Sequence, residues 1–419
     1  MKVSPVFLFA SFVVANNPPA GCNPEIVVAQ PETPLGALRS APITFLPQNK
    51  GSSSPACLDG TPYGFYFVPS KKNSTKWTIL INGGGWCYDE VDCWCRSATD
   101  LGTSKNLPKT GTCGCLNALE DGSFDEDCNC IHLPYSDGAS FSGFKADPVA
   151  VPGTNETIFF RGIKNMDGVV DFAMAQGMTQ ATEFVVTGGS AGGLSTFLHA
   201  DRIAARLKQE APKCNHIRAA PVVGYFLDHD NYKHTTGYPG GPNSPQWSKP
   251  GTGANYTMWM KYIYSMQNLT FGSDGGLTKA CQEKHPSEPW LCFMSPHMVD
   301  VIDTPFFMFN SKYDAWQLAN ELQTSWGTKD EQQAVLKYGT DFMQQFAPVA
   351  KDPKNGAMIT SCICHGCPWP DLVLGGKNSY QHYADWYFGK TQGAAAIHID
   401  PRLPNGGGTF KFKQCSPFP

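Results

Sequence analysis

A glycine-rich turn around Ser190 constrains the fold more than any other stretch of this sequence. Residues 188–192 read G-G-S-A-G, which satisfies the pattern G-x-S-x-G. The apolar run 184–186 before it predicts a buried strand, and apolar residues at helical spacing follow over 194–207. Glycines flank a serine in such a strand–turn–helix unit because side chains there would clash, and the turn lifts the hydroxyl clear of the backbone. The stretch therefore predicts a nucleophilic Ser190.

Two alternatives to a nucleophile stay open for this turn. Gly, Ser and Ala are common residues, so the pentapeptide alone also fits a structural turn. A phosphate-binding loop is a poorer match, because the G-K-[ST] continuation is missing.

The rest of the chain predicts an α/β fold with a mainly parallel sheet and crossover helices. Strands are expected at "YGFYFVP", "WTILING" and "TPFFMFN", and helices in "FFRGIKNMDGVVDFAMAQGM" and "AWQLANELQTSW". No linker or internal repeat divides residues 16–419, so we expect one catalytic domain. A cysteine-rich segment at about 87–130 is interpreted as a disulfide-stapled insertion rather than core, and a Gly/Pro-rich loop is expected at about 237–256.

A serine nucleophile needs a base and an orienting carboxylate, which follow the serine in the order Asp, then His, in folds of this kind. Asp314 comes directly after a predicted strand. His365 comes later, and Cys362, Cys364 and Cys367 would pin its loop. His382 and His398 remain competitors for the base, and Asp228 is a rival carboxylate that we assign to the pocket.

The run "CICHGC" also fits a zinc site, with three thiolates and one imidazole as ligands. Secretion and the many other cysteines argue against it, because disulfides are the default in an oxidising compartment. We expect no metal and no cofactor.

Three backbone N–H groups are candidates for an oxyanion hole. "INGGGWC" ends its predicted strand in three glycines, which suits a loop that brings N–H groups to a reacting carbonyl. We assign the donors to Gly85 and Trp86, with Ala191 at the start of the helix after the serine. An ordinary glycine-rich turn is the alternative.

Bulk properties point to an exported, soluble protein. Residues 1–15 carry one Lys and a short apolar run, which predicts a signal peptide rather than a spanning helix. Sixteen cysteines and four N-x-[ST] sequons, at Asn73, Asn155, Asn255 and Asn268, fit the secretory pathway. A formal charge of −4 gives no electrostatic case for nucleic-acid or membrane binding. We expect a monomer.

Several blocks of the sequence together resemble one family. "ACLDGTPYGFY", "INGGGWC", "YSDGASFSG", "GGSAGGLSTFLHAD", "YDAWQ" and "SCICH" are similar to the pectin acetylesterase and Notum family of secreted serine carboxylesterases. The resemblance implies an α/β-hydrolase-like fold with nucleophile Ser190, acid Asp314 and base His365. Substrate-binding residues are expected at Gly84, Tyr88, Asp137, Phe141 and Asp228. Family members usually carry Cys where this chain has Ser136.

The resemblance is compatible with two classes of substrate. Family members remove either acetyl groups from plant cell-wall pectin or a fatty acyl group from a secreted protein. We expect hydrolysis of O-acetyl esters on a polysaccharide such as pectin, because "DGASFSG" and "YDAWQ" are more similar to the pectin acetylesterase branch. A hypothesis of another class is a secreted binding protein that keeps the hydrolase scaffold without turnover.

Overall fold

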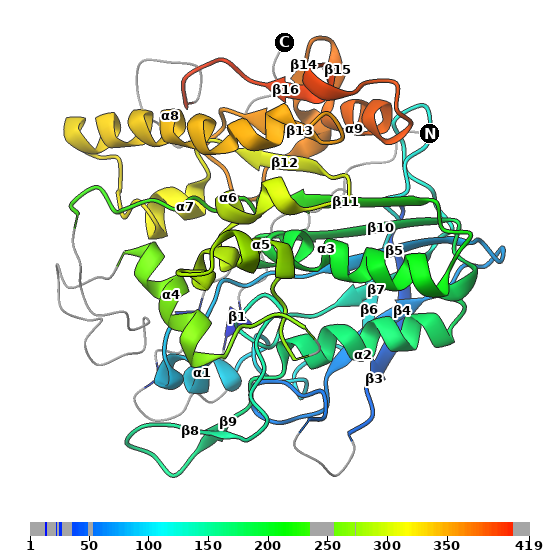
Figure 1. Cartoon of the computed structure of the whole chain (residues 1–419), viewed down its shortest axis with the longest axis vertical. Coiled ribbons are helices and arrows are strands. Elements are labelled where there is room, and N and C mark those ends of the chain that lie inside the picture. The colour runs from blue at the N-terminus through cyan, green and yellow to red at the C-terminus, as the bar shows by residue number, and fades with distance from the viewer. Residues whose placement is uncertain are drawn as a thin grey trace.

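A computed structural model describes residues 13–14, 22, 25–26, 36–48, 53–234, 255–272 and 274–404 of the chain (Figure 1). Apart from Val13–Val14, the predicted signal peptide lies outside the described residues. So does the predicted Gly/Pro-rich loop, apart from its last two residues.

Ten strands form the central sheet, in the order β16-β13-β12-β11-β10-β5-β7-β4-β3-β6. Pairings from β16 through β7 are parallel, and the last three strands add antiparallel pairs at one edge. The strands are β1 Val13–Val14, β2 Glu25–Ile26, β3 Arg39–Phe45, β4 Gly64–Val68, β5 Lys76–Ile81, β6 Thr110–Cys113, β7 Asn129–Leu133, β8 Val149–Ala150, β9 Thr157–Ile158, β10 Glu183–Gly189, β11 His216–Val222, β12 Phe307–Ser311, β13 Gly356–Thr360, β14 Val373–Leu374, β15 Lys377–Asn378 and β16 Ile397–Ile399.

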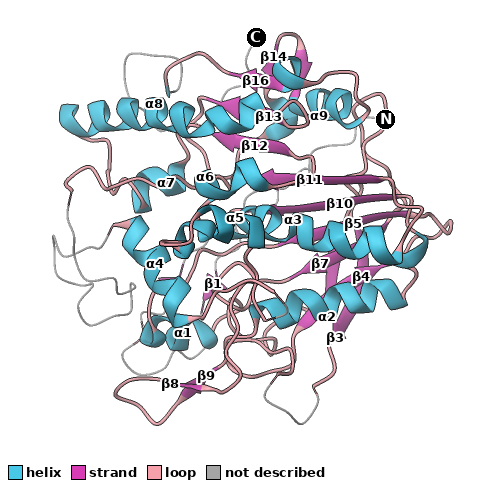
Figure 2. Ribbon diagram, in the orientation of Figure 1, coloured by secondary structure: helices cyan, strands magenta, loops and turns pink. Residues whose placement is uncertain are grey.

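Helices pack on both faces of this sheet (Figure 2). In β10, Phe184 and Val186 belong to one core with residues of α2, α3 and α8, while Val185 belongs to a second core with residues of α9. Alternate side chains of a strand point to opposite faces, so a strand buried on both faces is apolar throughout. The helices are α1 Glu90–Ser97, α2 Gly162–Ala175, α3 Ala191–Glu210, α4 Tyr256–Met266, α5 Lys279–Lys284, α6 Ser295–Met298, α7 Ala315–Asn320, α8 Lys329–Lys351 and α9 Ser379–Tyr387.

The expected mainly parallel α/β sheet is confirmed, and the strands expected at "YGFYFVP", "WTILING" and "TPFFMFN" correspond to β4, β5 and β12. The helix expected over "AWQLANELQTSW" is shorter, because α7 ends at Asn320. Leu322 and Thr324 then donate their N–H groups back to the carbonyls of Gln317 and Leu318, which closes the chain into a turn.

The cysteine-rich segment is stapled as expected, but it is not separate from the core. Disulfides join Cys87 to Cys93, Cys113 to Cys130 and Cys115 to Cys128. Strand β6 pairs with β3, and β7 lies between β5 and β4 inside the sheet. Interpreting the whole segment as an insertion is therefore wrong, since β6 forms one edge of the sheet and β7 lies inside it.

Candidate active site

Ser190 occupies the turn between β10 and α3. Its backbone has φ 58° and ψ −127°, a conformation that L-residues rarely adopt, and its N–H donates to the carbonyl of Val222. A Cβ on Gly188 or Gly192 would lie 2.5 or 2.2 Å from the carbonyl oxygen of Ile81. The two outer glycines of the motif are therefore required by the neighbouring strand β5.

The structure brings Ser190, His365 and Asp314 into one hydrogen-bonded line. His365 Nε2 lies 2.9 Å from Ser190 Oγ, and His365 Nδ1 lies 2.9 and 2.8 Å from the two carboxylate oxygens of Asp314. All three side chains are buried. Because Nδ1 faces a carboxylate, the tautomer with hydrogen on Nδ1 leaves Nε2 free to accept the serine proton.

Local structure fixes Asp314 at the carboxyl end of β12. Its side chain caps α7, where Oδ1 accepts from the N–H groups of Trp316 and Gln317 at 3.0 Å each. An N-terminal capping carboxylate is stabilised as an anion by these donors. The start of α7 therefore holds the carboxylate in place.

The loop of His365 follows β13 and is closed by a disulfide. Cys364 and Cys367 are bonded to each other, on either side of the histidine. The N–H of Ala315 donates to the carbonyl of Cys364 at 3.4 Å, which ties this loop to the start of α7. The zinc alternative is wrong, because this disulfide consumes two of its four ligands; among the described residues no group of three His, Cys, Asp or Glu could hold a metal ion.

The loop after β5 lies against the serine turn. A Cβ on Gly83 would be 2.2 Å from the carbonyl oxygen of Gly189, so the two loops touch through their backbones. Gly85 has φ 63°, which favours glycine. The N–H groups of Gly85 and Trp86 have no acceptor among the described residues. Ala191 opens α3, where the first N–H groups lack an intrahelical acceptor.

Arg96, a residue that the sequence analysis missed, holds this loop. The guanidinium of this α1 residue donates from Nη1 to the carbonyl of Gly84 at 2.7 Å and from Nη2 to that of Trp86 at 2.8 Å. With these two carbonyls turned toward Arg96, the peptide planes of the loop are fixed. No motif in the sequence distinguishes this arginine from a surface cation, since its role depends on the packing of α1.

Aromatic rings pack beside the serine and histidine. Trp86 lies 4.9 Å from Phe226, 5.8 Å from Tyr256 and 5.5 Å from Trp316 between ring centroids. Phe226 and Trp316 also lie 6.5 and 6.3 Å from the His365 ring. Of these rings the sequence analysis named Trp86 alone; Trp316, two residues after Asp314 in "YDAWQ", could have been found from that block.

Two of the candidate substrate-binding residues, Phe141 and Asp137, are buried in packing and turn contacts. Phe141 is fully buried between the rings of Tyr63 and Tyr135. Asp137 is 1% exposed and accepts from the N–H groups of Ala139 and Phe141, within its own turn. Both side chains therefore hold their own block together, and their contact with substrate stays a prediction.

The other three candidates also make contacts of their own. Gly84 packs so tightly that a Cβ would be 2.6 Å from Leu101, and Tyr88 stacks on Trp259 with 4.5 Å between centroids. Asp228 accepts from Thr257 and pairs with His297 at 2.8 Å rather than with His365. The rival carboxylate is therefore not the partner of the candidate base. The competing histidines His382 and His398 stack on each other, with 3.6 Å between ring centroids.

Comparison with known proteins agrees with this arrangement. The sequence model of the family described as Pectinacetylesterase matches residues 37–241 and 248–406. The chain belongs to this family. Pectin acetylesterase 11 of Arabidopsis thaliana is 30% identical over 350 residues, covering 79% of this chain and 81% of the relative. A palmitoleoyl-protein carboxylesterase, NOTUM of Drosophila melanogaster, is 26% identical over 76% of this chain and 44% of its own.

A solved structure shares the fold of this family member. The Wnt deacylase Notum from Drosophila aligns with a TM-score of 0.72 at 22% identity, covering 88% of this chain and 98% of that one. The structural likeness shows an α/β-hydrolase-like fold. The family and its curated relatives show that the chain is a carboxylic ester hydrolase. Of the described helices, none has the length and apolarity to cross a bilayer.

Proposed function

We propose that this protein is a secreted serine esterase that removes O-acetyl groups from a polysaccharide such as pectin. The observation that carries the proposal is the hydrogen-bonded line Ser190–His365–Asp314. The names of the Arabidopsis relatives support the acetyl ester, and six described disulfides support an oxidising, extracellular location. We expect the enzyme to act as a monomer, without a cofactor.

In the proposed mechanism, His365 Nε2 takes the hydroxyl proton as Ser190 Oγ attacks the ester carbonyl. Asp314 holds the imidazole and stabilises its cation. The N–H groups of Gly85, Trp86 and Ala191 bind the oxyanion, and each such donor lowers the barrier by about 3 kcal/mol. The cation then protonates the leaving sugar alcohol, and water attacks the acetyl-enzyme by the same route to release acetate.

The aromatic wall favours a short acyl group. Trp86 and Phe226 are 1% exposed and Tyr256 is fully buried, and the Phe226 ring lies 6.5 Å from the ring of His365. A long acyl chain would have to displace rings that are already packed edge to face, which costs the contacts they make. Removal of a fatty acyl group from a protein, as the name of the NOTUM relatives describes, is the second candidate.

Turnover of an ester series from acetyl to palmitoyl, with acetylated pectin alongside, tests the proposal. We expect kcat/KM to be highest for acetyl and to fall by at least about tenfold by octanoyl, since each added methylene must displace packed rings. Ser190→Ala is expected to lower kcat by about 10⁴-fold or more while leaving the fold intact.

Two outcomes would contradict the proposal. A preference for long acyl chains would move the assignment to the lipid deacylase. Failure of a fluorophosphonate to label Ser190 would favour the binding protein without turnover.

A further inference from the structure

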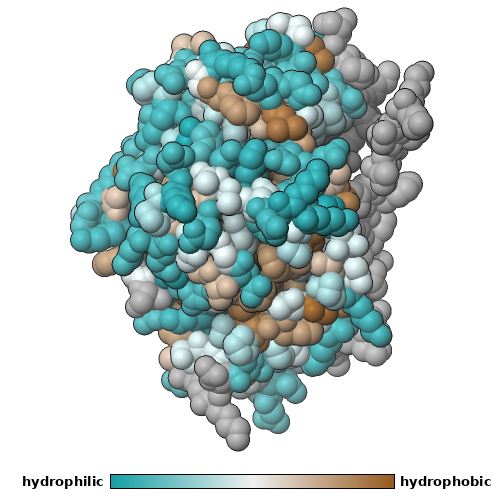
Figure 3. All heavy atoms as spheres, turned by 90° about the vertical axis from the view of Figure 1, so that its right-hand side faces the viewer, coloured by the Kyte–Doolittle hydropathy of each residue, from teal (hydrophilic) through white to brown (hydrophobic). Residues whose placement is uncertain are grey.

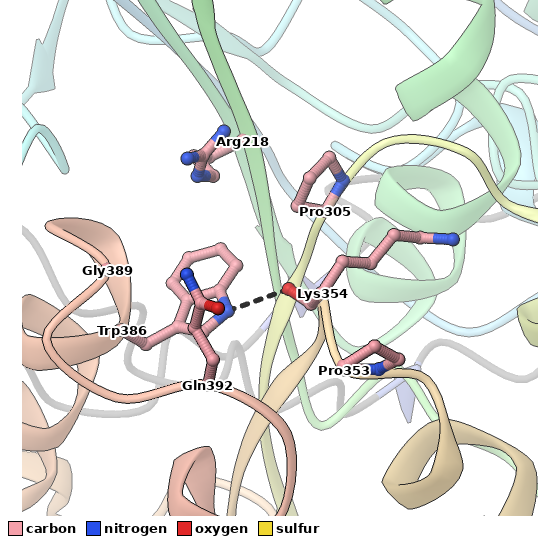
Figure 4. A pocket seen from close by; sticks show the side chains of 7 residues that line it. All are labelled: Arg218, Pro305, Pro353, Lys354, Trp386, Gly389 and Gln392. Atoms are coloured by element: carbon pink, nitrogen blue, oxygen red, sulfur yellow. Dashed lines mark hydrogen bonds between the residues drawn. The ribbon is translucent and has the colours of Figure 1, made fainter.

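A cavity lies near the amino ends of the central strands, whereas Ser190 follows the carboxyl end of β10. It measures about 310 Å³ and is lined by Arg218, Pro305, Pro353, Lys354, Trp386, Gly389 and Gln392 (Figure 4). Arg218 pairs in register with Val185 of the parallel strand β10, five residues before Ser190. At 3.3 Å per residue the two sites are roughly 17 Å apart. The cavity is therefore separate from the candidate active site.

Arg218 brings an unpaired positive charge into this cavity. Its side chain makes one hydrogen bond, from Nη1 to the carbonyl of Ile217 at 3.0 Å, and has no carboxylate partner among the described residues. The guanidinium lies 5.7 Å from the centroid of the Trp386 ring, which holds it in place. Burial lowers the pKa of Arg218, but a guanidinium stays charged at neutral pH. Four of its five N–H donors remain for a ligand.

The other lining groups add no second free charge. The Lys354 ammonium pairs with Asp352 at 2.6 Å, and Figure 4 shows its side chain extending away from Arg218. Trp386 Nε1 donates to the carbonyl of Lys354 at 3.0 Å, the dashed line in Figure 4. The Gln392 amide is exposed and has no partner in the described part of the chain. The cavity thus offers one cation, one free amide and two proline rings.

We propose that this cavity binds the carboxylate of a uronate sugar, as a second contact for the polysaccharide that the proposed function acts on. One guanidinium matches one carboxylate in a bidentate pair, in which the single charges balance. The Gln392 amide binds sugar hydroxyls, and Pro305 and Pro353 pack against C–H groups of the ring. Figure 3 shows the side of the molecule where β10 and β11 begin, and hydrophilic residues cover most of it.

The proposal rests on the polysaccharide substrate, and it separates the behaviour of polymers from that of small esters. A chain held at both sites gains apparent affinity through effective concentration, while a small acetyl ester uses the serine site alone. Loss of Arg218 should therefore raise KM for acetylated pectin without changing kcat/KM for 4-nitrophenyl acetate.

Calorimetric titration of trigalacturonate into the full-length Ser190→Ala protein tests the site directly. In that background, Arg218→Gln is expected to weaken binding by at least about tenfold, because a charge-assisted pair is lost. Gln392→Ala changes an exposed side chain and should weaken trigalacturonate binding by a few fold. Lys329→Gln, at the first turn of α8, removes the same charge far from the cavity and is the matched control.

The outcomes separate this inference from the proposed function. Equal weakening by Lys329→Gln, or unchanged binding in both Arg218→Gln and Gln392→Ala, would overturn the cavity site. Preserved hydrolysis of 4-nitrophenyl acetate with no turnover of acetylated pectin would instead overturn the polysaccharide function. Inorganic phosphate that displaces trigalacturonate at equal concentration would overturn the preference for a carboxylate.

Discussion

At the scale of single residues, Cys57 lies near Ser136, the position at which family members usually carry a cysteine. Cys57 is a free, fully buried thiol, and the side chain of Ser136 lies near enough to act on its pKa. The N–H of Leu58 donates to the carbonyl of Ser136 at 3.1 Å, so the two segments are already joined. Burial raises the pKa of the Cys57 thiol to about 11, which keeps it protonated and unreactive.

Ser136→Cys should form a disulfide with Cys57. Closing a loop of this length stabilises a folded chain by about 2–4 kcal/mol, chiefly by restricting the unfolded state. We expect a higher urea midpoint for the variant. Thiol titration of the denatured, non-reduced proteins should find one free thiol fewer in the variant than in the parent. Ser136→Ala, which cannot form the bond, is the control. One additional thiol with no gain in stability would refute the expectation.

The triad positions could be predicted from sequence because each follows from a local rule. Ser190 comes from its glycines and Asp314 from the end of a strand, while chain order and neighbouring cysteines single out His365. Contact of Asp137 and Phe141 with substrate stays a prediction, because a block of sequence does not say which way its side chains point. Arg96 carries no such signal, since its partners are backbone carbonyls brought close by the fold.

At the scale of elements, helix α1 and the loop after β5 form one unit. Asp89 caps α1 by accepting from the N–H of Asp92 at 2.7 Å, and Cys87 is bonded to Cys93 across the start of the helix. Arg96 then reaches back from the last turn to the carbonyls of Gly84 and Trp86. The helix therefore acts on the proposed oxyanion donors through their own peptide planes.

Arg96 is a positioning residue, and its loss should lower kcat with little change in KM. Arg96→Met frees two carbonyls and lets the loop rotate, so we expect kcat to fall by about 10–100-fold. This fall is no larger than the one caused by removing a single oxyanion-hole donor. Arg96→Lys keeps the charge and one carbonyl contact and should recover part of the loss. Steady-state kinetics with 4-nitrophenyl acetate, with melting temperatures as the folding control, measure both. A rise in KM at constant kcat would point to a substrate-binding role instead.

Element types were predictable where period and length agreed, as for β4, β5, β10 and α3. The cysteine-rich segment was misinterpreted because β6 and β7 have ordinary strand lengths but dense cysteines, which suggested an insertion. Their places in the sheet depend on pairing with β3, β4 and β5, which are distant in sequence. Local patterns cannot specify such non-local pairs.

At the scale of the whole molecule, the protein buries several neutral histidines in its layers. Burial lowers the pKa of His132, His216 and His398 to about 4 and that of His199 to about 3. In the unfolded chain these rings titrate near about 6.5. The unfolded state therefore binds more protons between the two values, and stability is lost as the pH falls from about 6.5 to about 4. Asp137 has the opposite effect on stability. Burial raises its pKa to about 7, so its contribution to stability grows as the pH falls below 7.

Burial lowers the pKa of five histidines, these four and His382, and raises that of three carboxyl groups, Asp100, Asp137 and Glu321. The histidines outnumber the carboxyl groups, so we expect the urea midpoint to be lower at pH 4.5 than at pH 7. His199 makes the sharpest test, because it lies in α3, fully buried, with Nε2 3.1 Å from the carbonyl of Ser140. His199→Gln keeps a donor for that carbonyl and removes the titrating ring. In this variant the unfolding free energy should fall less steeply between pH 7 and pH 4.5. The difference in slope should correspond to at most about one proton taken up on unfolding. His234→Gln, at a side chain 78% exposed, is the matched control. An equal slope in His199→Gln and the parent would show that the buried rings do not set the acid limit of this fold.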